Sequence, residues 1–454
     1  MMNRKDHHIV RKIATKFLAA WDNSSRLSES PRKFEDNPQQ TNPVSEILRY
    51  ADLDYIKTII KNPDDLISFA GGWVNHKAPE KLRDAYKTIS SDINLFHISG
   101  GYSATLGERE FKKAICKFEK KLYGMEIHEN EIAVGSGSTQ LTMDVLRVLL
   151  NPKDKILLLD PTYVNFLPQL TVGFSDIEIL RFPIIDENEW KFVADEKIDE
   201  FTNFILNEKP KIVLLTSPDN PTSKILSDEF IKKTLESVKK VGGFLIIDFA
   251  YKELVYDDKL PSYFSWSPND NFVLLRSNSK WCRGLGRRLG WIEAPKFVID
   301  AMELIQSSSI LCPDTLHQMA LTKFINDSIE NDVLVDYISE TKKMYKDAAK
   351  KTADLIKQNL EFKIIEPDGG LYIFMKVDTD GQKFVQEMLK KTGVLFIPGW
   401  GFGNAGKNAV RVSFGPLVND IPKIEEGIIK ISKILKQDNK KKPIGKKWQS
   451  ILKN

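Results

Sequence analysis

Lys280 and Asp248 are the two residues of this sequence whose surroundings first suggest chemistry. Lys280 follows the apolar run 272–275 and a short polar turn, and a stretch rich in glycine comes after it. Asp248 ends the apolar run 244–247, where a carboxylate is expensive to bury unless it is paired. Burial and a nearby cation lower the pKa of a lysine and make its amine a nucleophile. The pattern therefore predicts a reactive amine and a buried acid that needs a cationic partner.

Groups suited to binding anions stand at two further places. Ser138 and Thr139 lie where a predicted strand, 131–135, meets a predicted helix, 139–150, so backbone N–H groups and the helix dipole point at one site. Arg411 lies in a β-rich run, where an unpaired charge would be awkward and a carboxylate could bind the guanidinium through two hydrogen bonds. The nearby glycines match neither a dinucleotide fingerprint nor a phosphate-binding P-loop.

Short apolar runs position these residues. Runs of four or five nearly all apolar residues occur at 155–159, 177–180, 211–215, 244–248 and 272–275. Strands that are apolar throughout are buried on both faces, which predicts an α/β fold with a mostly parallel sheet flanked by helices. Polar residues follow the strands at 136–139, 161–163, 217–222, 248–251 and 277–280. Because parallel strands present their carboxyl ends at one edge, these loops predict one shared ligand site.

The character of the sequence changes twice along the chain. The first 43 residues are rich in polar residues and have little to bury. After residue 295, a long helical region at about 297–360 precedes a strand–turn–strand pattern. We therefore expect an N-terminal arm or linker at 1–43, a large α/β domain at 73–324, a small α+β domain made of 44–72 with 325–437, and a basic tail at 438–454.

Composition excludes several classes of function. The chain has 454 residues and a formal net charge of +4, which gives no reason to expect a nucleic-acid partner. No apolar run approaches the roughly 20 residues of a transmembrane helix, so we expect no membrane partner. Three dispersed cysteines and six histidines without ligand spacing predict neither a disulfide framework nor a metal site. A reducing, cytoplasmic location is the simpler expectation.

Eight motifs together resemble the class I and II aminotransferases of pyridoxal-phosphate (PLP) fold type I, in the order of that family and over about residues 67–435. The first is most similar to the aminoadipate and kynurenine aminotransferase branch. The motifs are Ile67-Ser-Phe-Ala-Gly-Gly72, Tyr102-Ser-Ala-Thr-Leu-Gly107, Ser136-Gly-Ser-Thr-Gln140, Asn220-Pro-Thr222, Asp248-Phe-Ala-Tyr251, Ser277-Asn-Ser-Lys280, Gly286-Arg-Arg-Leu-Gly290 and Val410-Arg-Val-Ser-Phe414.

The resemblance implies a role for each residue, with PLP as the cofactor. The catalytic residues would be Lys280, which forms the Schiff base, together with Asp248 on the pyridine nitrogen and Tyr251 on the phenolic oxygen. The remaining cofactor contacts would be Asn220 on the phenolic oxygen, Tyr163 on the ring face, and Ser138, Thr139, Ser277 and Arg288 on the phosphate. Gly72, Asn220 and Arg411 would bind the substrate. Tyr102 would reach the phosphate of the neighbouring subunit, which implies a homodimer.

The activity implied is ping-pong transfer of an amino group from an L-amino acid to a 2-oxo acid, with Lys280 as the proton shuttle. A PLP-dependent lyase, decarboxylase or synthase on the same fold stays open, because the same residues serve those reactions. A PLP-sensing regulator is disfavoured, since residues 1–43 are too short for a DNA-binding domain. The segment Trp73-Val-Asn-His76 departs from the proline-containing turn of the family branch, so the sequence does not reveal the amino donor.

Overall fold

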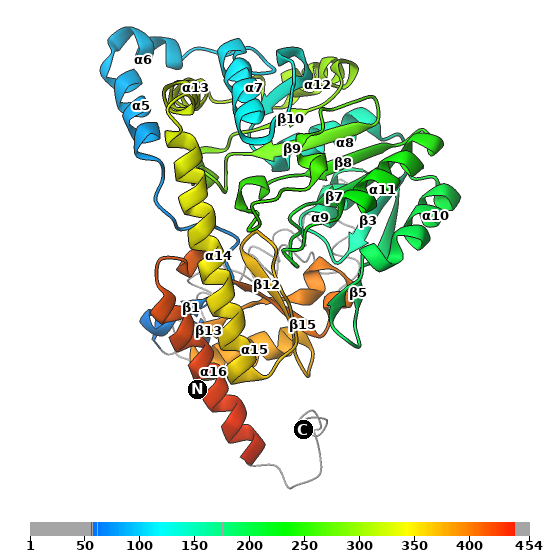
Figure 1. Cartoon of the computed structure of the whole chain (residues 1–454), viewed down its shortest axis with the longest axis vertical. Coiled ribbons are helices and arrows are strands. Elements are labelled where there is room, and N and C mark those ends of the chain that lie inside the picture. Colours follow the sequence, from blue (N-terminus) through cyan, green and yellow to red (C-terminus); the bar gives the residue numbers. More distant parts are fainter. Residues whose placement is uncertain (1–55, 57, 61, 175, 441–454) are drawn as a thin grey trace, which may run out of the picture.

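The structure is a computed structural model that describes residues 56, 58–60, 62–174 and 176–440 of the 454-residue chain. The arm or linker predicted at 1–43 lies outside the described residues, and so does the predicted basic tail beyond residue 440. The described residues form a larger and a smaller sheet, each covered by helices (Figure 1).

Seven strands form the large sheet, and the predicted mixed, mostly parallel arrangement is confirmed. The spatial order is β2 (Ile132–Gly135), β10 (Gly290–Glu293), β9 (Phe272–Ser277), β8 (Phe244–Asp248), β7 (Ile212–Thr216), β3 (Lys155–Asp160) and β4 (Glu178–Pro183). Strand β10 is antiparallel to both neighbours, and every other pairing is parallel. The sequence did not predict β10, because its four residues begin with glycine and end with a buried glutamate.

The two faces of the large sheet bury alternate residues of the same strands. Leu158, Leu214 and Ile246 pack under α8 (Ser138–Leu149) and α12 (Lys296–Ser309), while Leu157 and other alternate residues pack under α10 (Ile198–Glu208) and α11 (Asp228–Val241). Successive side chains of a strand point to opposite faces, so a sheet with helices on both sides requires apolar residues at every position. This explains the uninterrupted apolar runs.

Three more helices cover the end of the sheet that carries β2 and β10. They are α5 (Glu80–Ser91), α7 (Arg109–Tyr123) and α13 (Thr315–Ile329), whose buried faces share one apolar cluster with those two strands. The short α6 (Ile93–Ser99) follows α5 and buries none of its residues.

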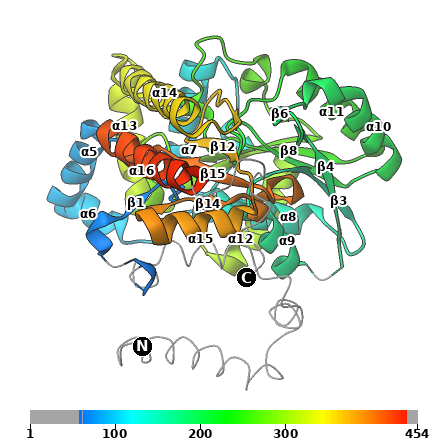
Figure 2. The same ribbon diagram turned by 90° about the horizontal axis from the view of Figure 1, so that it is seen from below.

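The smaller sheet is antiparallel, in the spatial order β11 (Ile364–Ile365), β12 (Tyr372–Lys376), β15 (Ala409–Ser413) and β14 (Ile397–Pro398). Beside it, β1 (Ile67–Ser68) pairs with β13 (Val394–Leu395) in parallel. The helices of this part are α14 (Val333–Leu360), α15 (Gly381–Thr392) and α16 (Ile421–Lys440), and they share its apolar core. Seen from below, α14 and α16 lie next to each other (Figure 2).

The long helical region predicted over 297–360 consists of three separate helices, α12, α13 and α14. The first break contains Pro313, and the second contains Asp332, whose φ of 61° lies in the left-handed region. Both features end a regular helix. The predicted domain boundaries stay a prediction, and the one at 324/325 falls inside α13.

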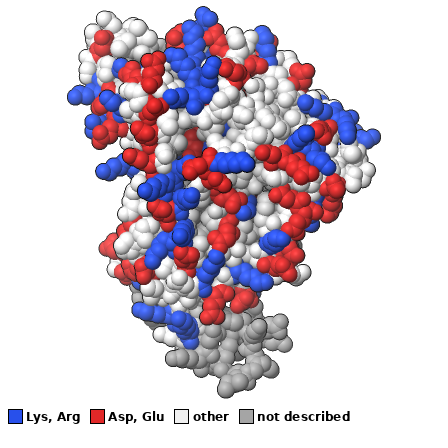
Figure 3. Space-filling model, viewed as in Figure 1, with Lys and Arg blue, Asp and Glu red and all other residues white. Residues whose placement is uncertain are grey.

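Every helix in the described part of the chain is too short or too polar to cross a membrane. On the face drawn in Figure 3, basic and acidic side chains are interspersed over the surface.

Candidate active site

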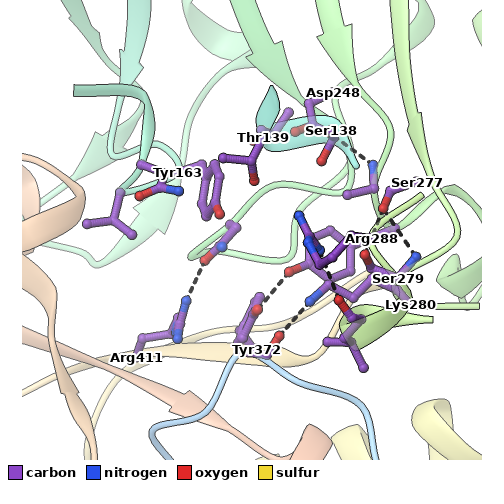
Figure 4. Close-up of a pocket in the computed structure, with 18 residues that line it drawn as sticks. Ser138, Thr139, Tyr163, Asp248, Ser277, Ser279, Lys280, Arg288, Tyr372 and Arg411 are labelled. Carbon is purple, nitrogen blue, oxygen red and sulfur yellow. Dashed lines mark hydrogen bonds between the residues drawn. The ribbon is translucent and has the colours of Figure 1, made fainter. Parts of the chain in front are cut away.

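A cavity of about 310 Å³ lies at the carboxyl ends of the large-sheet strands, where the smaller sheet meets them. It is lined by all the predicted site residues except Tyr102: Gly72, Ser138, Thr139, Tyr163, Asn220, Asp248, Tyr251, Ser277, Lys280, Arg288 and Arg411. In Figure 4, Asp248 and Thr139 lie on one side of the cavity, and Arg411 and Tyr372 lie on the other. The volume is at the lower end of the range for small-ligand sites.

Lys280 lies in the turn that follows β9, and its Nζ donates a hydrogen bond to the carbonyl of Gly72 at 2.5 Å. Burial, together with the positive charges of Arg411 and Arg288, lowers the pKa of Lys280 to about 7, although the charge of Asp248 opposes this shift. The neutral form of the amine is therefore accessible near neutral pH. A neutral amine in a cavity is available as a nucleophile or a base.

Asp248, the last residue of β8, is a buried carboxylate at the edge of this cavity. Its Oδ1 accepts a hydrogen bond from the backbone N–H of Ala250 at 2.9 Å. Burial raises the pKa of Asp248 to about 6, although this hydrogen bond and the charges of Lys280 and Arg276 pull it down. No cation of the described residues lies within ion-pair distance of this carboxylate, so a cationic atom of a ligand is a suitable partner.

Arg411 lies on β15 and is held in place by neutral groups. Its Nη1 donates to Oδ1 of Asn220 at 2.9 Å, and its Nη2 donates to the carbonyl of Ala70 at 3.0 Å. Its Nε is buried and has no hydrogen-bond partner, and its guanidinium lies 4.2 Å from the ring centroid of Tyr372. A buried guanidinium without a carboxylate partner among the described residues is suited to an anionic group of a ligand.

The start of α8 borders the cavity through Ser138 and Thr139, and the first N–H groups of a helix have no partner within the helix. Gly137 precedes the helix with a φ of 88°, and a Cβ at this position would lie 2.7 Å from Nη2 of Arg288. Arg288 is held by the carbonyls of Leu285 and Ser136. The Oγ of Ser277, at the end of β9, hydrogen-bonds to the Oγ of Ser279 at 2.9 Å. Together these groups offer a helix N-terminus, hydroxyls and a guanidinium to one anion.

Three tyrosines surround the cavity between the acid and the guanidinium. Burial raises the pKa of Tyr163 to about 12 and the pKa of Tyr251 well above its ordinary value, so both are neutral phenols. The hydroxyls of Tyr251 and Tyr372 hydrogen-bond at 2.7 Å. Nζ of Lys280 lies 5.6 Å from the ring centroid of Tyr251, which brings the amine and this phenol together.

Tyr102 does not join this group. Its side chain is 86% exposed, and it borders a separate surface groove with Leu95, Ile98 and Met319. Within one chain, therefore, the structure separates Tyr102 from the other predicted site residues.

Seven lining residues were not predicted from the sequence, and one of them, Tyr372, contacts both Tyr251 and Arg411. The others are Val164, Asn165, Thr216, Ala250, Ser279 and Leu285. Val164 and Asn165 directly follow Tyr163, and Ala250 and Ser279 lie inside recognised motifs, so closeness in sequence could have identified these four. Tyr372 follows the turn 367–370, and only the pairing of β12 with β15 places it beside Arg411.

Comparisons with known proteins agree with this geometry. The sequence profile of the family "Aminotransferase class I and II" matches residues 65–422. An aspartate aminotransferase of Thermotoga maritima is 26% identical over 381 residues, which cover 84% of this chain and 94% of that protein. The aromatic-amino-acid aminotransferase 2 of Thermococcus litoralis is 25% identical, covering 89% and 98%. The solved structure of an aromatic aminotransferase from Pyrococcus horikoshii superposes with a TM-score of 0.73 at 23% identity, covering 86% and 100%.

The chain belongs to the class I and II aminotransferases, and it is an enzyme that transfers amino groups. The fold is PLP fold type I. The more specific similarity to the aminoadipate and kynurenine branch stays a prediction.

Enzymes of this family depend on PLP, and the cavity residues fit that cofactor. Asp248 has no ion pair with another described residue and can pair with a protonated ring nitrogen. The N-terminus of α8, together with Arg288, offers donors for a phosphate in the same cavity. Among the described residues, no cluster of histidine, cysteine and acidic side chains is suited to a metal ion.

Proposed function

We propose that this enzyme binds PLP in the cavity and uses Lys280 both as the covalent lysine and as the proton carrier in transfer between an L-amino acid and a 2-oxo acid. The observation that carries the proposal is the amine of Lys280. It has a pKa of about 7 and lies in one cavity with a buried acid and a buried guanidinium. Few structural lysines combine these features, because burial of a lysine without a function is costly.

Each part of the cofactor has a complementary group in this proposal. Asp248 pairs with the pyridine nitrogen, Tyr163 covers the ring face, and Asn220 and Tyr251 bind the phenolic oxygen. Ser138, Thr139, Ser277 and Arg288 bind the phosphate. When bound, the cofactor supplies an electron-accepting ring that stabilises negative charge at the α-carbon of the substrate.

The substrate is held and deprotonated by residues of this chain. Arg411 binds the α-carboxylate, and the absence of a side chain at Gly72 leaves room for it, since a Cβ there would lie 3.7 Å from Nη2 of Arg411. Lys280 would take the proton from the α-carbon of the substrate and return it to the C4′ carbon of the cofactor. After the first oxo acid leaves, a second one reverses these steps, which makes the reaction ping-pong.

We further propose a homodimer in which Tyr102 contacts the phosphate in the neighbouring subunit. The exposure of Tyr102 supports this proposal, and so do the exposed apolar side chains of α6, since Ile93, Phe96 and Ile98 are 78%, 53% and 57% exposed. Exposed apolar patches of this kind mark protein interfaces. We also propose a cytoplasmic location, on the basis of the few and dispersed cysteines.

The proposal is tested by visible absorption spectra of purified protein with added PLP. We expect a band that Lys280→Ala abolishes and that Lys296→Ala, a change at an exposed lysine, leaves unchanged. Amino acids, including aspartate, aromatic amino acids, kynurenine and aminoadipate, are then added one at a time. A donor that shifts the band, with reversal by a 2-oxo acid, identifies the substrate class.

An unchanged band in Lys280→Ala would contradict the role of Lys280. A band that no 2-oxo acid restores after donor addition would favour lyase, decarboxylase or synthase chemistry instead.

A further inference from the structure

Tyr372 is a cavity residue whose contacts connect two parts of the proposed machinery. Its hydroxyl lies 2.7 Å from the hydroxyl of Tyr251, and the two rings are nearly perpendicular, with centroids 5.8 Å apart. The same ring lies under the guanidinium of Arg411, at 4.2 Å. Figure 4 shows Tyr372 beside Arg411, with a dashed line to the neighbouring phenol. Tyr372 therefore contacts both Arg411, the proposed ligand of the substrate carboxylate, and Tyr251, a proposed ligand of the cofactor.

The position of Tyr372 is fixed from several sides. Its strand, β12, pairs with β15, and Tyr372 stands opposite Ser413. Its backbone N–H donates to Oγ of Ser223 at 3.1 Å. The side chain is 1% exposed, and a Cβ on Gly72 would lie 3.0 Å from the Tyr372 hydroxyl oxygen. A phenol with so little freedom keeps its hydroxyl in one place without further cost in entropy.

The number of available protons determines which of the two phenols donates in the hydrogen bond between Tyr251 and Tyr372. Each hydroxyl has one proton to donate. If Tyr251 donates its proton to the phenolic oxygen of the cofactor, then Tyr251 must accept the proton of Tyr372. Hydroxyls arranged in such a chain polarise one another, so the first donor strengthens the second.

We propose that Tyr372 is a positioning residue that donates to Tyr251, and so directs and strengthens the hydrogen bond from Tyr251 to the phenolic oxygen of the cofactor. This inference rests on the proposed function. It assigns separate tasks to the two parts of one side chain, because the hydroxyl acts on Tyr251 and the ring supports Arg411.

The hydroxyl is tested with Tyr372→Phe in the PLP-loaded enzyme, by following the visible absorption as a function of pH without substrate. A weaker donor leaves more negative charge on the phenolic oxygen, so the protonated form of the bound cofactor persists to higher pH. We expect the midpoint of the absorbance change to rise by about half to one pH unit.

Tyr256→Phe is the matched control. The hydroxyl of Tyr256 is also buried and donates to the carbonyl of Gly370 at 2.9 Å, but it does not line the cavity. Its loss should affect stability and leave the midpoint unchanged. In a Tyr251→Phe background, adding Tyr372→Phe should produce no further shift, because the residue through which it acts is gone.

The ring is tested separately through the affinity for an unreactive carboxylic acid, succinate, measured by spectral titration. Tyr372→Phe keeps the ring under Arg411 and should change the dissociation constant by less than about twofold. Tyr372→Leu removes the ring and should weaken binding roughly fivefold, as expected for loss of a partly desolvated cation–π contact.

The outcomes separate this inference from the proposed function. No midpoint shift in Tyr372→Phe, an equal shift in Tyr256→Phe, or a further shift in the Tyr251→Phe background would each overturn the inference while the function stands. If the wild-type protein shows no band that depends on Lys280, both fail together.

Discussion

Lys280 and Asp248 carry opposite pKa shifts for the same physical reason. Burial disfavours the charged form of each group, so the pKa of the lysine falls to about 7 and the pKa of the aspartate rises to about 6. Both shifts cost stability in the free protein. A ligand with a cationic ring atom and a carbonyl carbon would relieve both costs, which is a common relation between stability and function at active sites.

Because burial of the charged Lys280 side chain lowers stability, we expect Lys280→Met to stabilise the cofactor-free protein in a pH-dependent way. The pKa of about 7 lies below 10.5, the ordinary value for lysine, so the unfolded wild-type chain binds more protons between these pH values. Wild-type stability therefore rises with pH across this window. We expect the thermal midpoint of the variant to exceed that of wild type by several degrees near pH 7, and the difference to vanish above about pH 10.

Thermal unfolding at several pH values measures this effect. Lys232→Met, at an exposed lysine, should show no pH-dependent difference from wild type. A constant gain at every pH would mean that the variant merely packs better.

Arg411→Lys tests whether the geometry of the guanidinium or only its charge is needed. Lysine keeps the charge but cannot form two parallel hydrogen bonds to a carboxylate. Loss of one charge-assisted hydrogen bond costs about 1.5–3 kcal/mol, so KM for the amino donor should rise roughly 10- to 100-fold. Steady-state kinetics measure this change, while the absorbance spectrum without substrate should stay that of wild type. Arg287→Lys, at an exposed arginine near the same loop, should leave KM unchanged.

At the scale of elements, a buried ion cluster joins the segments that carry the site. Arg276 of β9 pairs with Glu119 of α7 at 2.7 Å and with Glu253 at 2.7 Å, and Lys252 pairs with Glu119 at 3.0 Å. Burial and the charge of Glu119 raise the pKa of Glu293, the third acidic neighbour of Arg276 in this cluster, to about 8, which favours its protonated form at neutral pH.

Two residues of this cluster are direct neighbours in sequence of proposed cofactor ligands. Lys252 follows Tyr251 in the chain, and Arg276 precedes Ser277. Because the ion pairs are completely buried, they fix how the loop after β8 sits against β9 and α7.

Arg276→Met should destabilise the protein by about 3–5 kcal/mol, because it leaves carboxylates buried without their main partner. Urea denaturation measures the change as a lower midpoint. The control is Lys155→Met, which removes a half-exposed pair with Glu208 and should cost less than about 1 kcal/mol. A similar loss of unfolding free energy in both variants would show that burial does not determine how much an ion pair stabilises this protein.

At the scale of the whole molecule, the proposed homodimer, in which Tyr102 reaches the neighbouring subunit, predicts that two subunits share each site. Lys280→Ala and Tyr102→Ala should each lose activity alone. In a mixed dimer, one site regains both wild-type residues, so mixing and reassembly should restore about a quarter of the wild-type activity. The measurement is specific activity after the two variants are co-refolded, with each variant refolded alone as the control. No recovery in an assembly shown to contain mixed dimers would contradict a shared site.

Most elements of the fold could be predicted because their signals are local. The central strands β3, β7 and β8 are nearly all apolar, and α8 has helical apolar spacing. Strand β10 could not be predicted in this way, because it ends with the polar residue Glu293. Only its pairing with β2 and β9 places Glu293 in the interior. The three helices at 296–360 share one helical pattern, and only their separate packing partners distinguish them.

The amino-acid sequence by itself determined which residues gather at the edge of the sheet, because a lysine, an aspartate and polar turns directly after apolar strands can share only that edge. The tertiary structure decided the contacts between distant segments. Tyr372 and Arg411 belong to the small sheet, and they meet Tyr251 and Asn220 only because that sheet packs over the strand ends. The pKa of Lys280 depends on the same packing, since its burial and the charge of Arg411 come from residues far away in the chain.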